Sequence, residues 1–176
     1  LHPEEREYYD PYLLPDMDKA VKRIRAAIEA REQIVVYGDY DADGITATTV
    51  LLRTLQQLGG WADYYIPDRF TEGYGVNLEA LKRMHRQGTS LVITVDCGIK
   101  SVEELRQMQD CMDFVVTDHH LPGDELPPAV AVIDAHRQGS KCPCGELAGV
   151  GIAFKLCQAL WLGMKKVPAE NPGLEI

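Results

Sequence analysis

The chain is 176 residues long, the usual size of one domain, and its 45% apolar and 26% charged residues are typical of a globular protein that can bury a core without disulfide bonds. Its 18 Lys and Arg residues against 27 Asp and Glu residues give a net charge of −9, which excludes a protein that coats duplex nucleic acid through overall charge alone. No apolar run approaches the roughly 18 residues that a membrane helix needs, and no signal-peptide pattern opens the sequence, so we expect neither a membrane protein nor a secreted one.

Helices and strands are predicted to alternate along the chain. Apolar residues recur at spacings of three and four in the predicted helices, whereas the predicted strands are short apolar runs rich in β-branched residues. In chain order, the pattern predicts a helix over 17–28, a strand over 34–37, a helix over 47–58, a strand over 62–66, a helix over 77–87, a strand over 91–95, a helix from 101 onward, strands over 114–117 and 130–133, and a helix over 150–162. The segment 167–176 is typical of a linker because of its prolines.

Local signals support these elements and set the fold class. Asp16 is a candidate N-cap of the first helix, and Ser101 with Glu104 has the spacing of a capping box. Gly59-Gly60 and Gly88 end the second and third helices. The alternation favours an α/β fold, a doubly wound and mostly parallel sheet with helices on both faces. In such sheets a ligand binds beyond the carboxyl ends of the strands.

Acidic residues and histidines follow three of the predicted strands. The first strand runs into Asp39-Tyr40-Asp41-Ala42-Asp43-Gly44, the third into Asp96-Cys97-Gly98, and the fourth into Asp118-His119-His120. Carboxylates that converge on one sheet edge repel one another unless cations lie between them. Carboxylates with imidazoles suit manganese, iron or zinc, and magnesium fits where oxygens dominate. The sequence therefore favours a metal site, in which two ions about 3.5–4 Å apart would suit phosphoryl hydrolysis.

The acidic loop has three other interpretations. Its Asp-x-Asp-x-Asp-Gly pattern matches the first half of an EF-hand, but Val50 stands where calcium needs Glu, and the loop follows a strand. Asp41-x-Asp43-Gly44 is also similar to the nucleophile loop of haloacid-dehalogenase phosphatases, but Ile45 stands where those enzymes have Thr. The third interpretation is a solvated turn rich in Asp and Gly. Asp96 and the histidine pair favour metal binding over all three.

The histidine pair and the cysteines each have a simpler interpretation. His119-His120 could be an incidental surface turn, but Asp118 ahead of it can hold an imidazole in one tautomer. The cysteines form no even disulfide ladder, and the tight pair Cys142-Pro-Cys144 lacks the second pair or the spaced histidines of a structural zinc site. We expect reduced thiols and a cytoplasmic protein.

Six ordered segments resemble the DHH phosphoesterase superfamily and, within it, the RecJ family of single-strand-specific exonucleases. These segments are 36–46, 67–75, 95–98, the signature Asp118-His119-His120, 146–156 and 10–18. The resemblance covers nearly the whole chain. It implies Mn²⁺- or Mg²⁺-dependent hydrolysis of phosphodiester bonds at a two-metal site. The expected substrate is single-stranded DNA, degraded from the 5′ end to 5′-mononucleotides in DNA repair and recombination.

The resemblance also implies the metal ligands. Asp41, Asp43 and His119 would be ligands, and Asp96 would bridge the two ions. Asp39 would be a ligand or an outer partner of one. The bound water would then become a hydroxide near neutral pH, as two-metal hydrolases require.

Further residues would contact the substrate. His120 would hold the second ion or touch the scissile phosphate, and Arg69 would clamp a phosphate with its planar fork. Tyr74, and less so Phe70, are candidates for stacking on bases, with ordinary loop packing as the alternative. Tyr37 stands where some relatives have a His ligand, so one ion would be held more weakly.

The chain departs from the family beyond these segments. The family has a further acidic ligand after the Leu147–Gly151 stretch, then a second, DHHA1-type domain, and RecJ enzymes carry an OB-type module for single strands. Asp134 ends a different strand and is not taken as the missing ligand. We therefore expect residues 1–176 to be a fragment of a DHH catalytic domain. We expect it to be monomeric, with single-stranded DNA as its partner and no membrane contact.

Two other functions and one local alternative stay open. A DHH phosphodiesterase for short oligonucleotides or cyclic dinucleotides would have a differently spaced first motif, and Glu72–Gly75 favours the exonuclease. An inactive scaffold on the same fold would have lost its metal carboxylates, which this chain retains. Gly149-Val150-Gly151 is either an anion-binding nest at a helix start or a glycine-lined contact with the sheet.

Overall fold

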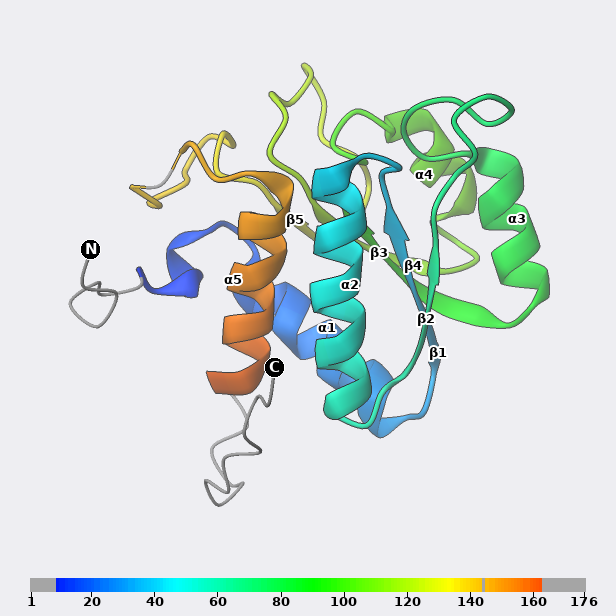
Figure 1. Cartoon of the computed structure of the whole chain (residues 1–176), viewed down its shortest axis with the longest axis horizontal. Coiled ribbons are helices and arrows are strands. Elements are labelled where there is room, and N and C mark those ends of the chain that lie inside the picture. The colour runs from blue at the N-terminus through cyan, green and yellow to red at the C-terminus, as the bar shows by residue number, and fades with distance from the viewer. Residues whose placement is uncertain (1–8, 144, 163–176) are drawn as a thin grey trace.

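The structure, a computed structural model, describes residues 9–143 and 145–162 (Figure 1). Each predicted helix and strand is present in these residues, and a short 3₁₀ helix, η2, precedes them. In chain order the elements are η2 (Pro11–Leu13), α1 (Met17–Glu29), β1 (Gln33–Gly38), α2 (Ala42–Gln57), β2 (Trp61–Tyr65), α3 (Leu78–Arg86), β3 (Thr89–Val95), α4 (Val102–Met108), β4 (Asp113–Thr117), β5 (Ala131–Ile133) and α5 (Gly149–Leu162). The predicted linker 167–176 lies outside the described residues.

The five strands form one sheet in the order β2-β1-β3-β4-β5, and every neighbouring pair is parallel. The predicted α/β fold class is confirmed. From β1 the chain winds in one direction to β2, and from β3 it winds in the other direction to β4 and β5. The switch therefore lies between β1 and β3. Loops that leave such a switch diverge and open a crevice at the carboxyl ends of the two strands.

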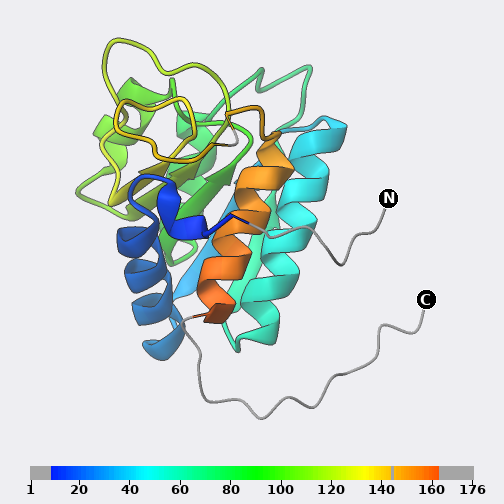
Figure 2. The same cartoon turned by 90° about the vertical axis from the view of Figure 1, so that its left-hand side faces the viewer.

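Helices cover both faces of the sheet. Alternate strand residues enter two separate cores, as Ile34 and Val36 do on one face and Val35 and Tyr37 do on the other. The first core is covered by α1, α2 and α5, which lie side by side in Figure 2, and the second by α3 and α4. No helix in the described part of the chain is both long and apolar enough to cross a bilayer.

Two residues that were predicted to cap helices lie at the N-cap position, but their side chains form no capping hydrogen bond. Asp16 is the N-cap residue of α1, but it has a left-handed backbone (φ 56°) and its side chain makes no capping bond. Instead its carboxylate accepts from Arg137 Nη1 at 2.6 Å and from the backbone N–H of Val132 at 3.3 Å, which ties α1 to β5. Ser101 likewise begins α4 without capping it, and its Oγ accepts from the N–H of Val76 at 3.3 Å. Both polar groups serve tertiary contacts, which local spacing does not encode.

The second helix begins five residues before its predicted start. Asp41 is its N-cap, and the Asp41 carboxylate accepts from the N–H groups of Asp43 and Gly44 at 2.9 and 3.0 Å. Asp43 therefore lies in the first turn of α2 rather than in a loop. A helix start directly after β1 brings the N-terminal dipole of α2 to the carboxyl edge of the sheet.

Candidate metal centre

Four aspartates directly follow four neighbouring parallel strands and lie at one edge of the sheet, here called the acidic rim. Asp96 follows β3, Asp118 follows β4, and Asp134 follows β5. Backbone hydrogen bonds from Asp96 N to Thr117 O and from Asp118 N to Ile133 O, both 3.1 Å, continue the sheet ladder through these positions. Asp39 follows β1 on the other side of Asp96. The predicted convergence of strand ends is confirmed, since Asp39, Asp96 and Asp118 lie at one edge of the sheet.

Two groups of ligand atoms gather at this rim, and Asp96 belongs to both. Oxygens of Asp39, Asp41 and Asp96 lie within 4.8 Å of one another, as do single atoms of Asp96, His119 and His120. His119 Nε2 is 3.1 Å from Asp96 Oδ1. A carboxylate shared by two ligand groups has the position that a bridging ligand needs.

The carboxylates of Asp39 and Asp96 are buried, and each has an oxygen that receives no hydrogen bond from the part of the chain that the structure describes. Asp39 is 5% exposed and Asp96 2% exposed, and in each the Oδ1 atom forms no hydrogen bond among the described residues. Burial, and next the charges of Asp43 and Asp41, raise the pKa of Asp96 to about 7. Burial also raises the pKa of Asp39. Buried oxygens that lack donors and repel one another are what a cation would satisfy, so the residues present fit divalent metal ions.

Asp118 holds the second histidine rather than joining the ligand groups. It is 1% exposed, its Oδ1 lies 2.7 Å from His120 Nδ1, and its Oδ2 accepts from the N–H of Ile99 at 2.9 Å. Burial disfavours the charged imidazole of His120, but the hydrogen bond and charge of Asp118 outweigh it and raise the pKa of His120. With Nδ1–H donated to Asp118, Nε2 is the atom of His120 that can bind a metal ion.

Asp118→Asn is expected to lower the pKa of His120, because the neutral amide no longer stabilises the imidazolium. We expect the affinity for Mn²⁺ to fall about 10- to 100-fold, the usual cost of losing an outer partner of a ligand. The pKa is measured by NMR titration of the metal-free protein, and the affinity by calorimetry. An unchanged His120 pKa would show that the contact does not orient the ring.

The N-terminus of α5 binds a carboxylate of the chain itself. The N–H groups of Gly149 and Val150 donate to the two oxygens of Asp43, each at 2.7 Å. A Cβ on Gly149 would lie 2.4 Å from Asp96 Oδ1, closer than any real contact. Both alternatives for the glycine segment are thus present: an anion sits on the helix start, and the glycine makes room for a neighbouring group. Asp43 Oδ2 is 3.8 Å from His119 Nε2, so Asp43 borders the second ligand group.

The predicted substrate residues are placed unequally around this centre. Tyr74 OH lies 3.4 Å from a ring nitrogen of His120, and the two rings meet edge to face at 6.0 Å. The Arg69 guanidinium lies over the Tyr40 ring at 5.3 Å, beside the ligand groups rather than among them. Phe70 is 93% exposed. Tyr74 and His120 also line a cavity of about 360 Å³ that reaches Gly98 and Lys100.

Tyr37 does not point toward the ligand groups. It is fully buried in the second core, its OH donates to Gly75 O at 3.2 Å, and it accepts from the N–H of Asn77 at 3.0 Å. Its role, like that of Gly149, was not visible in the sequence, because each depends on a partner brought in by the fold. Asp134, which the sequence does not indicate as a ligand, is fully buried with one oxygen unpaired among the described residues, and burial raises its pKa.

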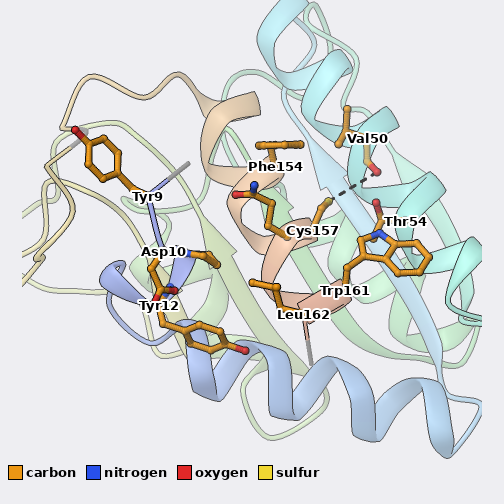
Figure 3. Close-up of a pocket in the computed structure, with 11 residues that line it drawn as sticks. Tyr9, Asp10, Tyr12, Val50, Thr54, Phe154, Cys157, Trp161 and Leu162 are labelled. Atoms are coloured by element: carbon orange, nitrogen blue, oxygen red, sulfur yellow. Dashed lines mark hydrogen bonds between the residues drawn. The ribbon is translucent and has the colours of Figure 1, made fainter. Parts of the chain in front are cut away.

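A larger groove, of about 870 Å³, lies elsewhere on the molecule (Figure 3). It is lined by apolar and aromatic side chains of α5, among them Phe154 and Trp161, with Val50 and Thr54 of α2 and residues 9–12. None of the predicted site residues lines it. The candidate site is therefore the acidic rim and not this groove.

Comparisons with known proteins show which family the chain belongs to. A family model described as the DHH family, N-terminal domain, matches residues 33–175. The single-stranded-DNA-specific exonuclease RecJ of Bacillus subtilis is 48% identical over 161 residues, which are 91% of this chain and 20% of that protein. RecJ of Escherichia coli is 42% identical over 151 residues, 84% of this chain and 26% of that protein. The chain thus spans a fifth to a quarter of the length of these relatives.

A solved structure is similar over the same region. The crystal structure of exonuclease RecJ bound to manganese matches with a TM-score of 0.76 and 36% identity, over 89% of this chain and 40% of that one.

Proposed function

This chain belongs to the DHH family, and from that membership we propose that its acidic rim takes part in the hydrolysis of phosphodiester bonds in single-stranded DNA. The reaction proceeds from the 5′ end and releases 5′-mononucleotides. The observation that carries the proposal is the pair of ligand groups that share buried Asp96. The relatives named as single-stranded-DNA-specific exonucleases support the substrate class.

Mn²⁺ or Mg²⁺ are the proposed cofactors, and a relative with bound manganese supports the first. Asp39, Asp41 and Asp96 would hold one ion, and Asp96, His119 and His120 the other. Asp43 remains a predicted ligand at the border of the second group. When bound, such ions lower the pKa of a coordinated water toward about 7 and neutralise charge on the phosphate.

The chain's own residues would orient the metal ligands and bind the DNA strand. Asp118 fixes the His120 ring, and Asp41 and Asp43 are fixed in turn by backbone N–H groups at the starts of α2 and α5. Arg69 would pair its planar fork with phosphate oxygens of the strand. Tyr74, on the wall of the cavity beside His120, would stack on a base. A net charge of −9 is compatible with a polyanionic substrate because the cations sit at the point of contact.

The extent of the protein is part of the proposal. We propose that residues 1–176 form one portion of a DHH catalytic domain that further polypeptide completes, as the share of the relatives' length supports. The protein acts as a monomer in the cytoplasm on single-stranded DNA.

Degradation assays on the full-length protein test the function. A 5′-labelled single strand, the same sequence as a duplex, and a cyclic dinucleotide are each incubated with Mn²⁺ and with chelator. We expect labelled 5′-mononucleotide from the single strand alone, and only with Mn²⁺. Faster hydrolysis of the cyclic dinucleotide would favour the phosphodiesterase, and no hydrolysis of any substrate would favour the inactive scaffold.

Arg69→Ala is expected to weaken substrate binding more than chemistry. Loss of one charged hydrogen-bonding group costs about 1.5–3 kcal/mol, which is roughly a 10- to 100-fold loss in kcat/KM. Steady-state kinetics with single-stranded DNA measure the effect, and Arg53→Ala on α2 is the matched control. An unchanged kcat/KM would remove Arg69 from the site.

A further inference from the structure

We propose that Tyr37 and Glu72 are positioning residues that hold the 67–75 loop in the arrangement that binds the substrate. The inference rests on the proposed function, because the loop carries Arg69 and Tyr74. It concerns two side chains, one in the 36–46 segment and one in the 67–75 segment, whose contacts the sequence does not reveal. Neither one lies in the two ligand groups.

Glu72 is an acidic residue of the 67–75 motif, but it belongs to neither ligand group. Its carboxylate accepts from Tyr65 OH at 2.6 Å and from Arg83 Nη2 at 2.8 Å. Tyr65 is the last residue of β2, and Arg83 lies on α3. Arg83 Nη2 also donates to Tyr65 OH at 2.7 Å, so the three side chains form a closed network. Glu72 is therefore the point at which the loop is attached to the sheet and to α3.

Tyr37 makes the second attachment, at the other end of the loop. Its hydroxyl spans the backbone just after Tyr74 by bonding Gly75 O and the N–H of Asn77. The hydroxyl thereby satisfies two backbone groups at once at the start of α3. The Tyr37 and Tyr65 rings lie 5.3 Å apart, so the two attachments are in contact with each other.

Between these attachments the loop contacts the rest of the molecule through Arg69, which lies over the Tyr40 ring, and through Tyr74, which lies beside His120. Asp68 closes the first half with bonds from the N–H groups of Phe70 and Thr71, both 2.9 Å, and those contacts are internal to the loop. Gly73 and Gly75 have positive φ angles of 78° and 88°, which set the path on each side of Tyr74. Little apolar surface is buried here, and segments of that kind open easily. The attachments through Glu72 and Tyr37 therefore fix where Tyr74 stands.

Different contacts therefore hold the metal ligands and the substrate-binding side chains of the loop in place. The acidic rim is fixed by the sheet ladder and by helix starts, which do not include the loop. Tyr74 OH lies 3.4 Å from a ring nitrogen of His120, and both residues line the cavity. Removing an attachment should thus displace the substrate-binding groups and leave the metal ligands in place.

The test compares Tyr37→Phe and Glu72→Gln with the control Tyr64→Phe. Tyr64 is the neighbouring β2 tyrosine and is 58% exposed. The quantities measured in the full-length protein are hydrogen exchange of the loop amides, affinity for a short single-stranded oligonucleotide, KM and kcat, affinity for Mn²⁺, and melting temperature. We expect the loop amides of both variants to exchange about 10-fold faster. Both variants should bind the oligonucleotide about 5- to 20-fold more weakly and show a KM raised by the same factor. We expect kcat to stay within about 3-fold of the wild type and the affinity for Mn²⁺ to be unchanged.

The outcomes separate this inference from the proposed function. Unchanged loop exchange and unchanged oligonucleotide affinity in both variants would overturn it, as would a fall in melting temperature and Mn²⁺ affinity with no change in KM. If the wild-type protein cleaves no single strand, the proposed function falls, while exchange and oligonucleotide binding still decide whether the loop is positioned as stated. Glu72→Gln decides alone if the buried Tyr37→Phe fails to fold.

Discussion

Asp96→Asn is expected to abolish Mn²⁺-dependent hydrolysis of single-stranded DNA, with a loss of at least about 10³-fold in kcat, since a catalytic metal supplies several kcal/mol. Asp96 is the residue common to both ligand groups. The amide keeps the shape of the side chain but lacks its charge. Both ions should therefore bind more weakly, while the sheet edge stays folded.

The same substitution has a signature in the metal-free protein. Because the pKa of Asp96 is raised to about 7 from 3.8, its protonated form stabilises the fold below pH 4, and this stability is lost as the pH rises toward 7. Asparagine cannot ionise, so the variant should lose less stability over that range than the wild type. Melting temperatures between pH 4 and 8 in chelator measure this, with exposed Asp110→Asn as the control. Wild-type turnover by Asp96→Asn would refute the bridging role.

Gly149→Ala is the second substitution with a large expected effect, although it adds only one methyl group. The new Cβ would meet Asp96 Oδ1 at 2.4 Å and Asp96 Cβ at 2.6 Å. Either Asp96 or the start of α5 must move, and moving α5 also breaks its bonds to Asp43. We expect a loss of about 1–3 kcal/mol in stability from the overpacking and a loss of Mn²⁺ affinity of 100-fold or more.

Gly145→Ala is the matched control, because nothing lies within 4 Å of a Cβ at that position. Chemical denaturation gives the free energy of unfolding of each variant, and calorimetry gives its affinity for Mn²⁺. If Gly149→Ala binds Mn²⁺ like the wild type, the close approach of α5 to Asp96 is not part of the site.

The sequence predicts the scaffold well because the scaffold depends on local patterns. Apolar periodicity gives each helix and strand, and the alternation gives the parallel sheet. The position of the site follows from the same pattern, since carboxylates after parallel strands must meet at one edge. Even the pairing of Asp96 with His119 could be expected, because both follow neighbouring strands.

Contacts between distant segments could not be predicted in this way. Asp43 stays a predicted ligand, but the sequence does not reveal that its two oxygens also accept hydrogen bonds from the start of α5, more than 100 residues later. Ser101 was expected to cap its own helix, yet it bonds the N–H of Val76. Tyr37 and Glu72 sit in the 36–46 and 67–75 motifs, but their hydrogen-bond partners come from other elements. A motif fixes which residue types are present, and the fold decides what each one touches.

Anomalous diffraction from a crystal of the protein soaked with Mn²⁺ tests the central claim most directly. The account predicts two peaks at the acidic rim, one on each side of the Asp96 carboxylate and each roughly 2 Å from its oxygens, with Asp39 and Asp41 around one peak and His119 and His120 around the other. A map with manganese bound elsewhere, or with no peak in contact with Asp96, would contradict it.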